Sequence, residues 1–316
     1  MIDMTIKELA EILNAEITNP VDIGRKVAGI NIDSRTVKPG EIFAALAGDN
    51  VDGHAYIASA AKSGAIGIIA DDPARIQGFY ENLIMVNDAR KALFKIAASI
   101  RGKLKIPVIA ITGTNGKTTV KNFVTHLLSS KYNVLASPKS FNNDLGLSLT
   151  MFSLLPEHEI LVMELGTNHP GEIAALAEVL KPEVAIITNI GSGHLGFFEN
   201  KENVFNEKAS LLRYIAKGGI AVLCGDDIFL ESARSGHYRM IFYGTGDNNS
   251  RRIQNVSCGD SGQEFILGDK KYTLPFCGEH NVYNAVSAII VAEYFGIDDE
   301  MIGKSIAGLK LPPFRM

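Results

Sequence analysis

The chain of 316 residues is long enough for two or three domains, and its hydrophobic content of 46% is enough for sizeable cores. Its formal net charge of -4 provides no basic field, so we do not expect nucleic acid as a partner. No apolar run approaches the ~18 residues of a membrane span, and no basic region with an apolar core opens the chain. We therefore expect a cytoplasmic protein without a membrane span, and a monomer.

The three cysteines, Cys224, Cys258 and Cys277, lie far apart in the sequence and match no metal-binding or redox spacing. We interpret all three as reduced residues of a cytosolic protein.

The first hundred residues alternate short strands and helices. Thr5 and Glu8 form a capping-box pattern ahead of an amphipathic helix. In chain order we then predict strands over 27–32 and 41–45, a helix over 56–63, a strand over 65–70 and a helix over 89–100. The polar, glycine-containing segment 101–105 is interpreted as a linker, so the predicted domains are 1–100 and 101–316.

Beyond the linker, apolar strands alternate with helices, which is typical of a largely parallel sheet covered by helices. These strands are predicted at 108–112, 132–136, 160–164, 184–190 and 220–224. From residue 238 the pattern changes, and we predict antiparallel strands at 238–243, 252–257, 264–267 and 272–275. Two helices follow, at about 280–295 and 298–308. The expected fold class is α/β, with an N-terminal α/β domain and a central P-loop ATPase-like domain whose mostly parallel sheet carries an added antiparallel sheet.

The strongest motif lies between the strand at 108–112 and a helical pattern from Val120 to Ser129. It reads Gly113-Thr114-Asn115-Gly116-Lys117-Thr118-Thr119. A glycine loop between a strand and a helix binds phosphate, because its N–H groups and the helix N-terminus attract anions. Lys117 is expected to reach the β- and γ-phosphates of ATP, and Thr118 to offer a hydroxyl to Mg²⁺. The usual first glycine would stand at Ile111, so this loop is a variant.

Polar residues follow several strands, at the sheet edge where α/β proteins bind ligands. Glu164 ends an apolar strand and is placed to bind Mg²⁺, although a solvated strand-end acid is the alternative. His194 lies in a glycine-rich loop after the strand at 184–190, and is equally well explained as a surface histidine.

Five further residues in three segments also allow either a functional or a purely structural interpretation. Asn142 and Asn143 follow the second strand of this domain, where a simple turn would also place them. Lys208 lies on a predicted helix over 204–214 and by itself would be a solvated lysine. Asn281 and Asn284 are three residues apart on a helix, so their amides share a face that could contact a base; a polar helix start is the alternative.

Together these motifs resemble the Mur ligase family, ATP-dependent amide-bond-forming enzymes of peptidoglycan synthesis, over nearly the whole chain. The segment 113–119 resembles the family's ATP loop. The segments 33–35, 39–46 and 52–54 resemble its UDP-sugar-binding N-terminal domain. The segments 141–147 and 164–173 resemble the member that adds D-alanyl-D-alanine, and residues 188–191, 194–195 and 207–208 are also similar to the family.

The resemblance implies roles for individual residues. Glu164 and His194 would be Mg²⁺ ligands, and Lys208 would be carbamylated and become a third, so two Mg²⁺ ions are expected. Asn281 and Asn284 would lie near the adenine and Arg315 near the ATP phosphates. The implied catalytic residues are Lys117, Glu164, His194 and Lys208. The implied substrate-binding residues are Ser34, Arg35, Asp52, His54, Asn142 and Asn143.

The implied reaction uses ATP to convert the terminal carboxylate of UDP-N-acetylmuramoyl-tripeptide into an acyl phosphate. The amine of D-alanyl-D-alanine then displaces phosphate. Whether the third residue of the tripeptide is lysine or diaminopimelate stays open. Family members continue beyond the position of Arg315 into a third domain, so we expect the 316-residue chain to bind its ligands without completing ligation.

Three alternatives remain. One is another amino-acid-adding member of the family. A second is folylpolyglutamate synthase, which shares the ATP loop but lacks a UDP-binding N-terminal domain such as residues 1–99 suggest. The third is a nucleotide-binding module without ligase activity.

Overall fold

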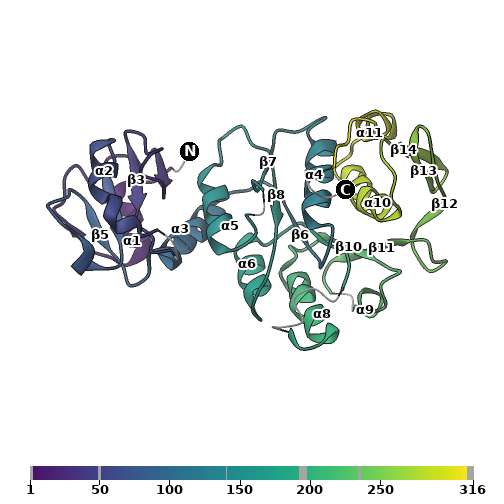
Figure 1. Cartoon of the computed structure of the whole chain (residues 1–316), viewed down its shortest axis with the longest axis horizontal. Helices are drawn as coiled ribbons and strands as arrows, with labels where there is room; N and C mark the ends of the chain where they lie inside the picture. The colour runs from purple at the N-terminus through teal and green to yellow at the C-terminus, as the bar shows by residue number, and fades with distance from the viewer. Residues whose placement is uncertain (1–2, 49–50, 140, 192–197, 234–235, 312–316) are drawn as a thin grey trace. The chain divides into compact units, whose positions relative to one another are not determined.

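A computed structural model describes residues 3–48, 51–139, 141–191, 198–233 and 236–311 (Figure 1). The chain divides into two compact units. Residues 1–104 and 144–156 form the first, and residues 105–143 and 157–316 form the second. Within the described ranges, no helix is both long and apolar enough to cross a membrane.

The first unit contains a five-stranded sheet. Its strand order is β1 (Ile17–Thr18), β5 (Leu83–Met85), β4 (Gly67–Ala70), β3 (Glu41–Ala44) and β2 (Gly29–Asn31). Strands β2 to β5 pair in parallel, whereas β1 pairs antiparallel with β5. The predicted strands at 27–32, 41–45 and 65–70 are confirmed. The pattern did not reveal β1 and β5, which are two and three residues long.

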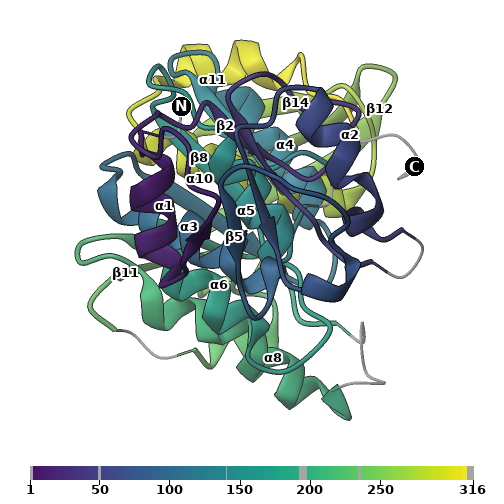
Figure 2. The ribbon, with the colours of Figure 1, turned by 90° about the vertical axis from the view of Figure 1, so that its left-hand side faces the viewer.

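Helices cover both faces of this sheet (Figure 2). On one face, α1 (Ile6–Leu13) and α3 (Ala89–Lys103) pack on Ile42 and Ile69. On the other face, α2 (Ile57–Lys62) packs on Phe43 and Ile68. Because successive residues of a strand point to opposite faces, a strand without polar side chains such as β4 supplies both cores. The described residues of the unit also form the 3₁₀ helices η1 (Gly53–Tyr56) and η2 (Pro73–Arg75).

The predicted linker is wrong in its structure, because α3 continues through Lys103. Arg101 and Lys103 lie in the last turn, where positive charge complements the helix dipole. The Arg101 guanidinium also donates a hydrogen bond to the carbonyl of Leu104 (3.0 Å). These contacts explain why a polar segment that contains a glycine remains helical.

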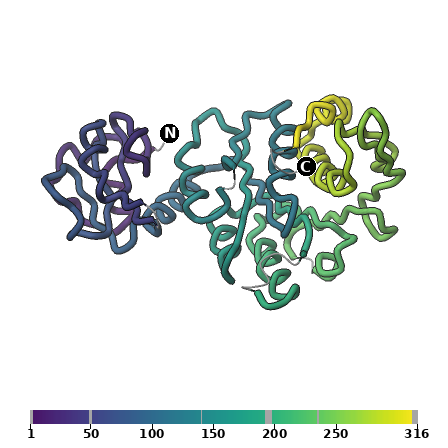
Figure 3. Tube along the Cα trace, viewed as in Figure 1, coloured from purple at the N-terminus to yellow at the C-terminus, as the bar shows by residue number. Residues whose placement is uncertain are grey.

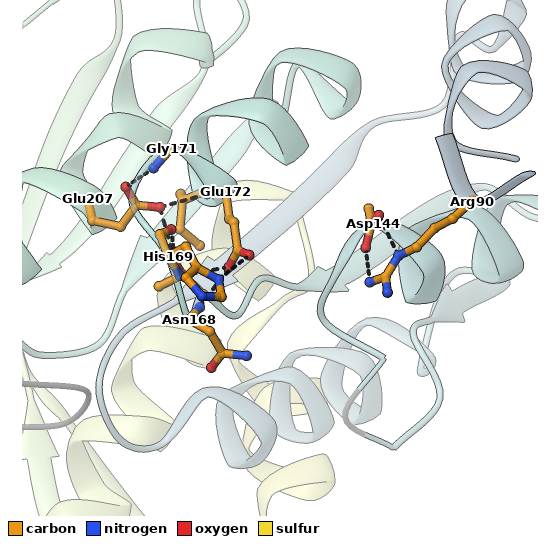
Figure 4. Close-up of polar contacts among 9 residues, drawn as sticks. Arg90, Asp144, Asn168, His169, Gly171, Glu172 and Glu207 are labelled. Carbon is orange, nitrogen blue, oxygen red and sulfur yellow. Dashed lines mark hydrogen bonds and ion pairs between the residues drawn. The ribbon is translucent and has the colours of Figure 1, made fainter. Parts of the chain in front are cut away.

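The first unit also includes α5 (Asp144–Phe152), which lies beyond the predicted domain boundary. Leu145 and Phe152 pack against the same core as α3. Arg90 on α3 donates to both carboxylate oxygens of Asp144, from Nε (2.8 Å) and Nη2 (2.5 Å) (Figure 4). Bidentate pairing of this kind fixes orientation as well as distance.

The second unit contains a nine-stranded sheet. Its order is β14 (Lys270–Leu274), β13 (Gly262–Leu267), β12 (Arg251–Gly259), β11 (Arg239–Gly244), β10 (Ile220–Cys224), β9 (Val184–Ile187), β6 (Val108–Thr112), β8 (Ile160–Glu164) and β7 (Val134–Ala136). Strands β7 to β11 pair in parallel, and β12, β13 and β14 pair antiparallel with one another in that order. The predicted parallel sheet with an added antiparallel sheet is confirmed.

One of the four strands predicted to be antiparallel is not. Strand β11 pairs in parallel with β10 over its first five residues, and its last two residues pair in parallel with the start of β12. The chain between β10 and β11 contains α9 (Ile228–Glu231), and this crossover returns it to the same end of the sheet.

Two groups of helices lie on opposite sides of the parallel strands (Figure 1). One group consists of α4 (Lys117–Leu128), α10 (Glu279–Tyr294) and α11 (Asp299–Ile306), and these three pack on one another. The other consists of α6 (Glu172–Leu180), α8 (Lys201–Ala209) and the 3₁₀ helix η3 (Ser210–Tyr214). Helices α10 and α11 also lie beside the antiparallel strands (Figure 3).

The expectation of three reduced cysteines is wrong, because Cys258 and Cys277 form a disulfide with a Cα–Cα distance of 5.8 Å. Cys258 on β12 pairs with Gln263 on β13, and Gln263 pairs with Leu274 on β14. The two antiparallel turns therefore bring together two residues that are 19 positions apart. Cys224 remains a free thiol, and its burial raises its pKa to about 11.

A thiol titration tests this pairing. Chain purified without reductant and then denatured should expose one thiol, Cys224, and a chain reduced before denaturation should expose three. Denaturation is needed because buried Cys224 reacts poorly when folded. A Cys258→Ser variant should expose two thiols without reductant. Three thiols in the unreduced wild type would contradict the disulfide.

Candidate functional site

The phosphate loop joins β6 to α4 and requires glycine at two positions. Gly113 has φ +146° and Gly116 has φ +82°, a backbone conformation that other residues rarely adopt. A Cβ at residue 113 would lie 1.9 Å from Oγ1 of Thr188, and one at residue 116 would lie 2.6 Å from Oδ1 of Asn284. Both glycines therefore allow the loop to approach neighbouring elements of the second unit.

The residues that follow β9 hold this loop in place. Thr188 donates its hydroxyl to the carbonyl of Asn115 (2.5 Å), and Asn189 accepts the Asn115 N–H through Oδ1 (3.0 Å). Asn189 also accepts the Thr114 N–H through its own carbonyl (3.0 Å). The Thr114 hydroxyl in turn accepts the Gly191 N–H (2.8 Å). The loop is thus preorganised by contacts with the residues that follow β9.

Lys117, the first residue of α4, folds back over the loop. Its ammonium donates to the carbonyls of Gly113 (2.9 Å) and Thr114 (3.0 Å). A positive charge held at the N-terminus of a helix reinforces the attraction of that helix for anions.

Glu164 at the end of β8 is brought against this loop, as the sequence predicts. Thr118 donates its hydroxyl to Oε2 of Glu164 (2.8 Å), and the amide of Asn142 donates to Oε1 (3.4 Å). Glu164 is only 2% exposed, so the alternative of a solvated strand-end acid is wrong. A hydroxyl and a carboxylate oxygen in contact are ligands that suit Mg²⁺.

Lys208 on α8 is 2% exposed, so it is not a solvated lysine either. Its burial, together with repulsion by Lys117, lowers its pKa to about 8. Among the described residues its ammonium forms no hydrogen bond or ion pair, and the nearby carboxylate of Glu207 offsets only part of the lowering. Since an isolated buried charge is unfavourable, the neutral amine is accessible near neutral pH.

Glu207, adjacent to Lys208, anchors the loop that follows Glu164 (Figure 4). It accepts hydrogen bonds from the Thr167 hydroxyl (3.3 Å) and from the N–H groups of Gly171 (2.7 Å) and Ile173 (2.8 Å). In the same loop Glu172 accepts the N–H groups of Asn168 (2.7 Å) and His169 (3.2 Å). The helix that carries Lys208 is therefore tied to the strand that carries Glu164.

A pocket of about 850 Å³ opens beside the phosphate loop. Asn281 and Asn284 on α10 both line it, so the predicted shared face is directed at the loop. They are 3% and 8% exposed, and the Asn281 amide donates to the carbonyl of Cys277 (3.3 Å). Besides these two, the lining residues are Thr114, Asn115, Gly116, Thr119, Thr188, Asn189, Cys224, Tyr243, Glu279, His280 and Tyr283.

Tyr283 forms a wall of this pocket and is held by Asp226. Its hydroxyl donates to Oδ2 of Asp226 (2.7 Å) and lies 3.3 Å from the Thr245 hydroxyl. Asp226 also accepts the N–H groups of Thr245 (2.7 Å) and Gly246 (3.0 Å). Burial alone would raise the pKa of Asp226, but these hydrogen bonds outweigh it and lower the pKa to about 2.

The residues predicted to contact the UDP group lie in the first unit. The side chain of Arg35 is 85% exposed and pairs with both oxygens of Asp33 (2.8 and 2.6 Å). It is therefore not a buried structural ion pair. Ser34 is buried, and Asp52 is partly exposed. The side chain of His54 is only 1% exposed, with Nδ1 2.8 Å from Asp52, so it shapes the loop and does not reach its surface.

His194 and Arg315 lie outside the described residues. Asn143 is exposed and follows Asn142 directly.

The chain matches the Mur ligase middle domain over residues 111–292 and the catalytic domain of the Mur ligase family over residues 26–101. The chain belongs to the Mur ligase family. It is 32% identical, over 100% of its length, to a UDP-N-acetylmuramoyl-tripeptide–D-alanyl-D-alanine ligase of Bacillus subtilis, and 31% identical to that of Escherichia coli. It covers 69% and 70% of these two relatives.

Solved structures of Mur ligases show the same fold. A MurF from Acinetobacter baumannii superposes with a TM-score of 0.88 at 30% identity, covering 98% of this chain and 69% of that one. A MurF ligase from Thermotoga maritima in complex with ADP has a TM-score of 0.81 at 27% identity, covering 93% and 68%.

The sequence did not assign a role to several residues of this Mur ligase site. Thr188 and Asn189 were noted only as similar to the family. Lys121, Asp226 and Tyr283 received no predicted role. A signal existed for Lys121, because it falls on the face of α4 that also carries apolar Val124 and Leu128.

Replacement of Lys117 by alanine tests the phosphate site. We expect the Kd for MgADP to rise at least about tenfold, because hydrogen bonds to charged groups contribute about 1.5–3 kcal/mol. The melting temperature should change little, since Lys117 is only partly buried. Isothermal titration calorimetry and thermal unfolding measure the two effects. The control is Lys217→Ala, which removes an exposed lysine of the same unit. Unchanged nucleotide affinity in Lys117→Ala would contradict the assignment.

Proposed function

We propose that this chain is an ATP-dependent amide-bond ligase that adds D-alanyl-D-alanine to UDP-N-acetylmuramoyl-tripeptide in peptidoglycan synthesis. The observation that carries the proposal is the likeness to ligases of this name over the whole chain, combined with a phosphate loop whose Thr118 contacts Glu164. The loop supports nucleotide chemistry, and the relatives supply the substrate class.

The nucleotide would bind between the phosphate loop and α10. The loop N–H groups and Lys117 would hold the phosphates, and the amides of Asn281 and Asn284 would face the base. This placement is supported by the pocket that joins these elements, and by the ADP complex of the Thermotoga maritima relative. Arg315 would add a phosphate contact, as the resemblance implies.

Two Mg²⁺ ions are part of the proposal, and the donor chemistry suits them. Thr118 and Glu164 would hold one, and His194 with a carbamate on Lys208 would hold the other. When bound, the ions would neutralise charge on the transferring phosphoryl group. The resident residues do the remaining work, because Thr188 and Asn189 keep the loop fixed and Lys117 attracts the phosphates.

The proposed reaction has two steps. A carboxylate oxygen of the tripeptide attacks the γ-phosphorus, the bond to the bridging oxygen breaks, and ADP leaves. The amine nitrogen of D-alanyl-D-alanine then attacks the carbonyl carbon, phosphate leaves with the bonding electrons, and the nitrogen loses a proton. Both steps need positioning more than covalent help from the protein, which agrees with a site rich in hydrogen bonds.

The UDP group would bind the first unit. Arg35 is the residue best suited to a diphosphate, because its guanidinium is exposed and presents a planar fork. Asp33 preorganises that fork, and Asp52 with buried His54 would shape the adjoining loop. Ser34 is a further proposed contact in this unit, and Asn142 and Asn143 are separate proposed substrate contacts in the second unit.

The proposed carbamate on Lys208 forms when the neutral amine nitrogen attacks the carbon of CO₂ and loses one proton. The position supports this, because the amine is buried and has a pKa lowered to about 8. A carbamate would replace a cation that repels Mg²⁺ by an anion that binds it.

Ligand-induced stabilisation tests the substrate class. UDP-N-acetylmuramoyl-tripeptide should raise the melting temperature more than the UDP-MurNAc-dipeptide or UDP alone, because tighter binding to the native state stabilises it more. A larger response to the dipeptide would indicate another amino-acid-adding member of the family, and a response to a folate alone would indicate folylpolyglutamate synthase. In Arg35→Ala the response to the tripeptide nucleotide should fall and the response to MgADP should persist. The control is Arg25→Ala, which removes an exposed arginine of the same unit.

Substitutions of Lys208 test the carbamate. Measured in the full-length enzyme, Lys208→Ala should lose nearly all ATP-dependent formation of the amide, and a small added carboxylate such as acetate should restore part of it. Lys208→Arg should stay inactive, since a guanidinium cannot carry the carbamate. Mass spectrometry of the products measures the turnover, with Lys217→Ala as the control. Normal turnover by Lys208→Arg would exclude the carbamate.

A further inference from the structure

The proposed reaction leaves one deeply buried charge unexplained, that of Lys121. It lies one turn beyond Lys117 on α4 and is 2% exposed. Its ammonium donates to the carbonyl of Ser137 (2.7 Å) and to the carbonyl of Lys139. It also lies 3.6 Å from Oε2 of Glu164, the oxygen that accepts the Thr118 hydroxyl.

Lys121 and its partners belong to three different parts of the second unit. Lys121 itself is on the helix of the phosphate loop, Ser137 and Lys139 follow β7, and Glu164 ends β8. Burial of an ammonium is unfavourable unless good hydrogen bonds and an opposite charge compensate it. Lys121 has hydrogen bonds to two carbonyls and the opposite charge of Glu164 nearby. Its side chain therefore connects α4, the segment after β7 and the end of β8.

The segment after β7 has its own contacts with β8. The Glu164 N–H donates to the Ser137 hydroxyl (3.2 Å), and the Gly166 N–H donates to the Asn142 carbonyl (2.8 Å). A Cβ at residue 166 would lie 2.5 Å from Nδ2 of Asn142, so the fit is close. The amide of Asn142 contacts Oε1 of Glu164, whereas the Thr118 hydroxyl contacts Oε2.

We infer that Lys121 is a positioning residue, which holds Glu164 and the backbone of Ser137 and Lys139 on the phosphate-loop helix and so couples Mg²⁺-nucleotide binding to the placement of Asn142. This inference rests on the proposed function, because it takes Glu164 as a metal ligand and Asn142 as a substrate contact. Lys121 contacts no reacting atom in this proposal. It acts through the residues that it holds.

Two roles for the same charge predict opposite results. A positive charge next to a cation site repels Mg²⁺, so removal of a merely repulsive lysine would strengthen the effect of Mg²⁺ on nucleotide binding. Removal of a positioning lysine would weaken that effect, since partners that orient a metal ligand contribute about 10–100-fold to metal affinity.

The experiment compares Lys121→Gln with Lys139→Gln in the whole chain. Both variants lose one positive charge from the same region, but the Lys139 side chain is exposed and only its backbone carbonyl meets Lys121. The Kd for ADP is measured by calorimetry with Mg²⁺ and with EDTA. We expect the Kd in EDTA divided by the Kd in Mg²⁺ to fall at least about tenfold in Lys121→Gln, which means that Mg²⁺ strengthens binding less. In Lys139→Gln this quotient should stay at the wild-type value.

Hydrogen exchange provides a readout that a purely structural role would not change. In the wild type, MgADP should slow amide exchange in residues 137–143, and in Lys121→Gln it should no longer do so, although α4 keeps its protection. If Lys121→Gln does not fold, Lys121→Arg replaces it, because the planar guanidinium keeps the charge but cannot reproduce the contacts of a compact ammonium. The same loss of coupling is expected.

Two outcomes would overturn the inference. One is a larger effect of Mg²⁺ in Lys121→Gln. The other is a lower melting temperature with unchanged Mg²⁺ dependence and unchanged nucleotide-induced protection. If the wild type itself binds no ADP, the proposed function fails, and that result is distinct from a failure of the role given to Lys121.

Discussion

The close approach of the phosphate loop to the end of β9 is the constraint on which the site of the second unit depends. Residue 113 must be glycine because Oγ1 of Thr188 occupies the place of a Cβ. That contact lets Thr188 and Asn189 bond the loop backbone, and the fixed loop directs the start of α4. The direction of α4 in turn sets the positions of Lys117, Thr118 and Lys121, which all lie on this helix.

Local sequence patterns predicted the parts of the fold that depend on neighbouring residues. Strands β6, β8 and β10 are apolar runs bounded by polar residues, and α1 begins at a capping box, so each was found near its bounds. Features that depend on residues far apart were not found. The direction of β11, the Cys258–Cys277 disulfide and the packing of α5 on α3 are set by chain crossings that no window of sequence contains.

The site likewise has features that the local sequence predicts and features that it does not. The loop motif and the strand-end acid Glu164 were predictable, because parallel strands deliver their ends to one edge of a sheet. The burial of individual side chains was not predictable from the sequence. The residues around Lys208 and His54 would equally well fit exposed side chains, but both side chains are buried. The link from Asp226 to Tyr283 spans 57 residues, and neither residue belongs to a motif, so only the folded chain reveals it.

Buried charges at this edge of the sheet distinguish a ligand site from a core. Glu164, Lys121, Glu207 and Lys208 are all less than a tenth exposed, although a charge in a protein interior is favourable only with partners. Glu164, Lys121 and Glu207 find those partners in neighbouring elements and so keep them in register. Lys208 lacks such a partner among the described residues and has a lowered pKa. Its environment therefore disfavours the protonated ammonium form of Lys208. Chemical modification of the side-chain nitrogen, or its binding to a metal, would remove the free-energy cost of burying that charge.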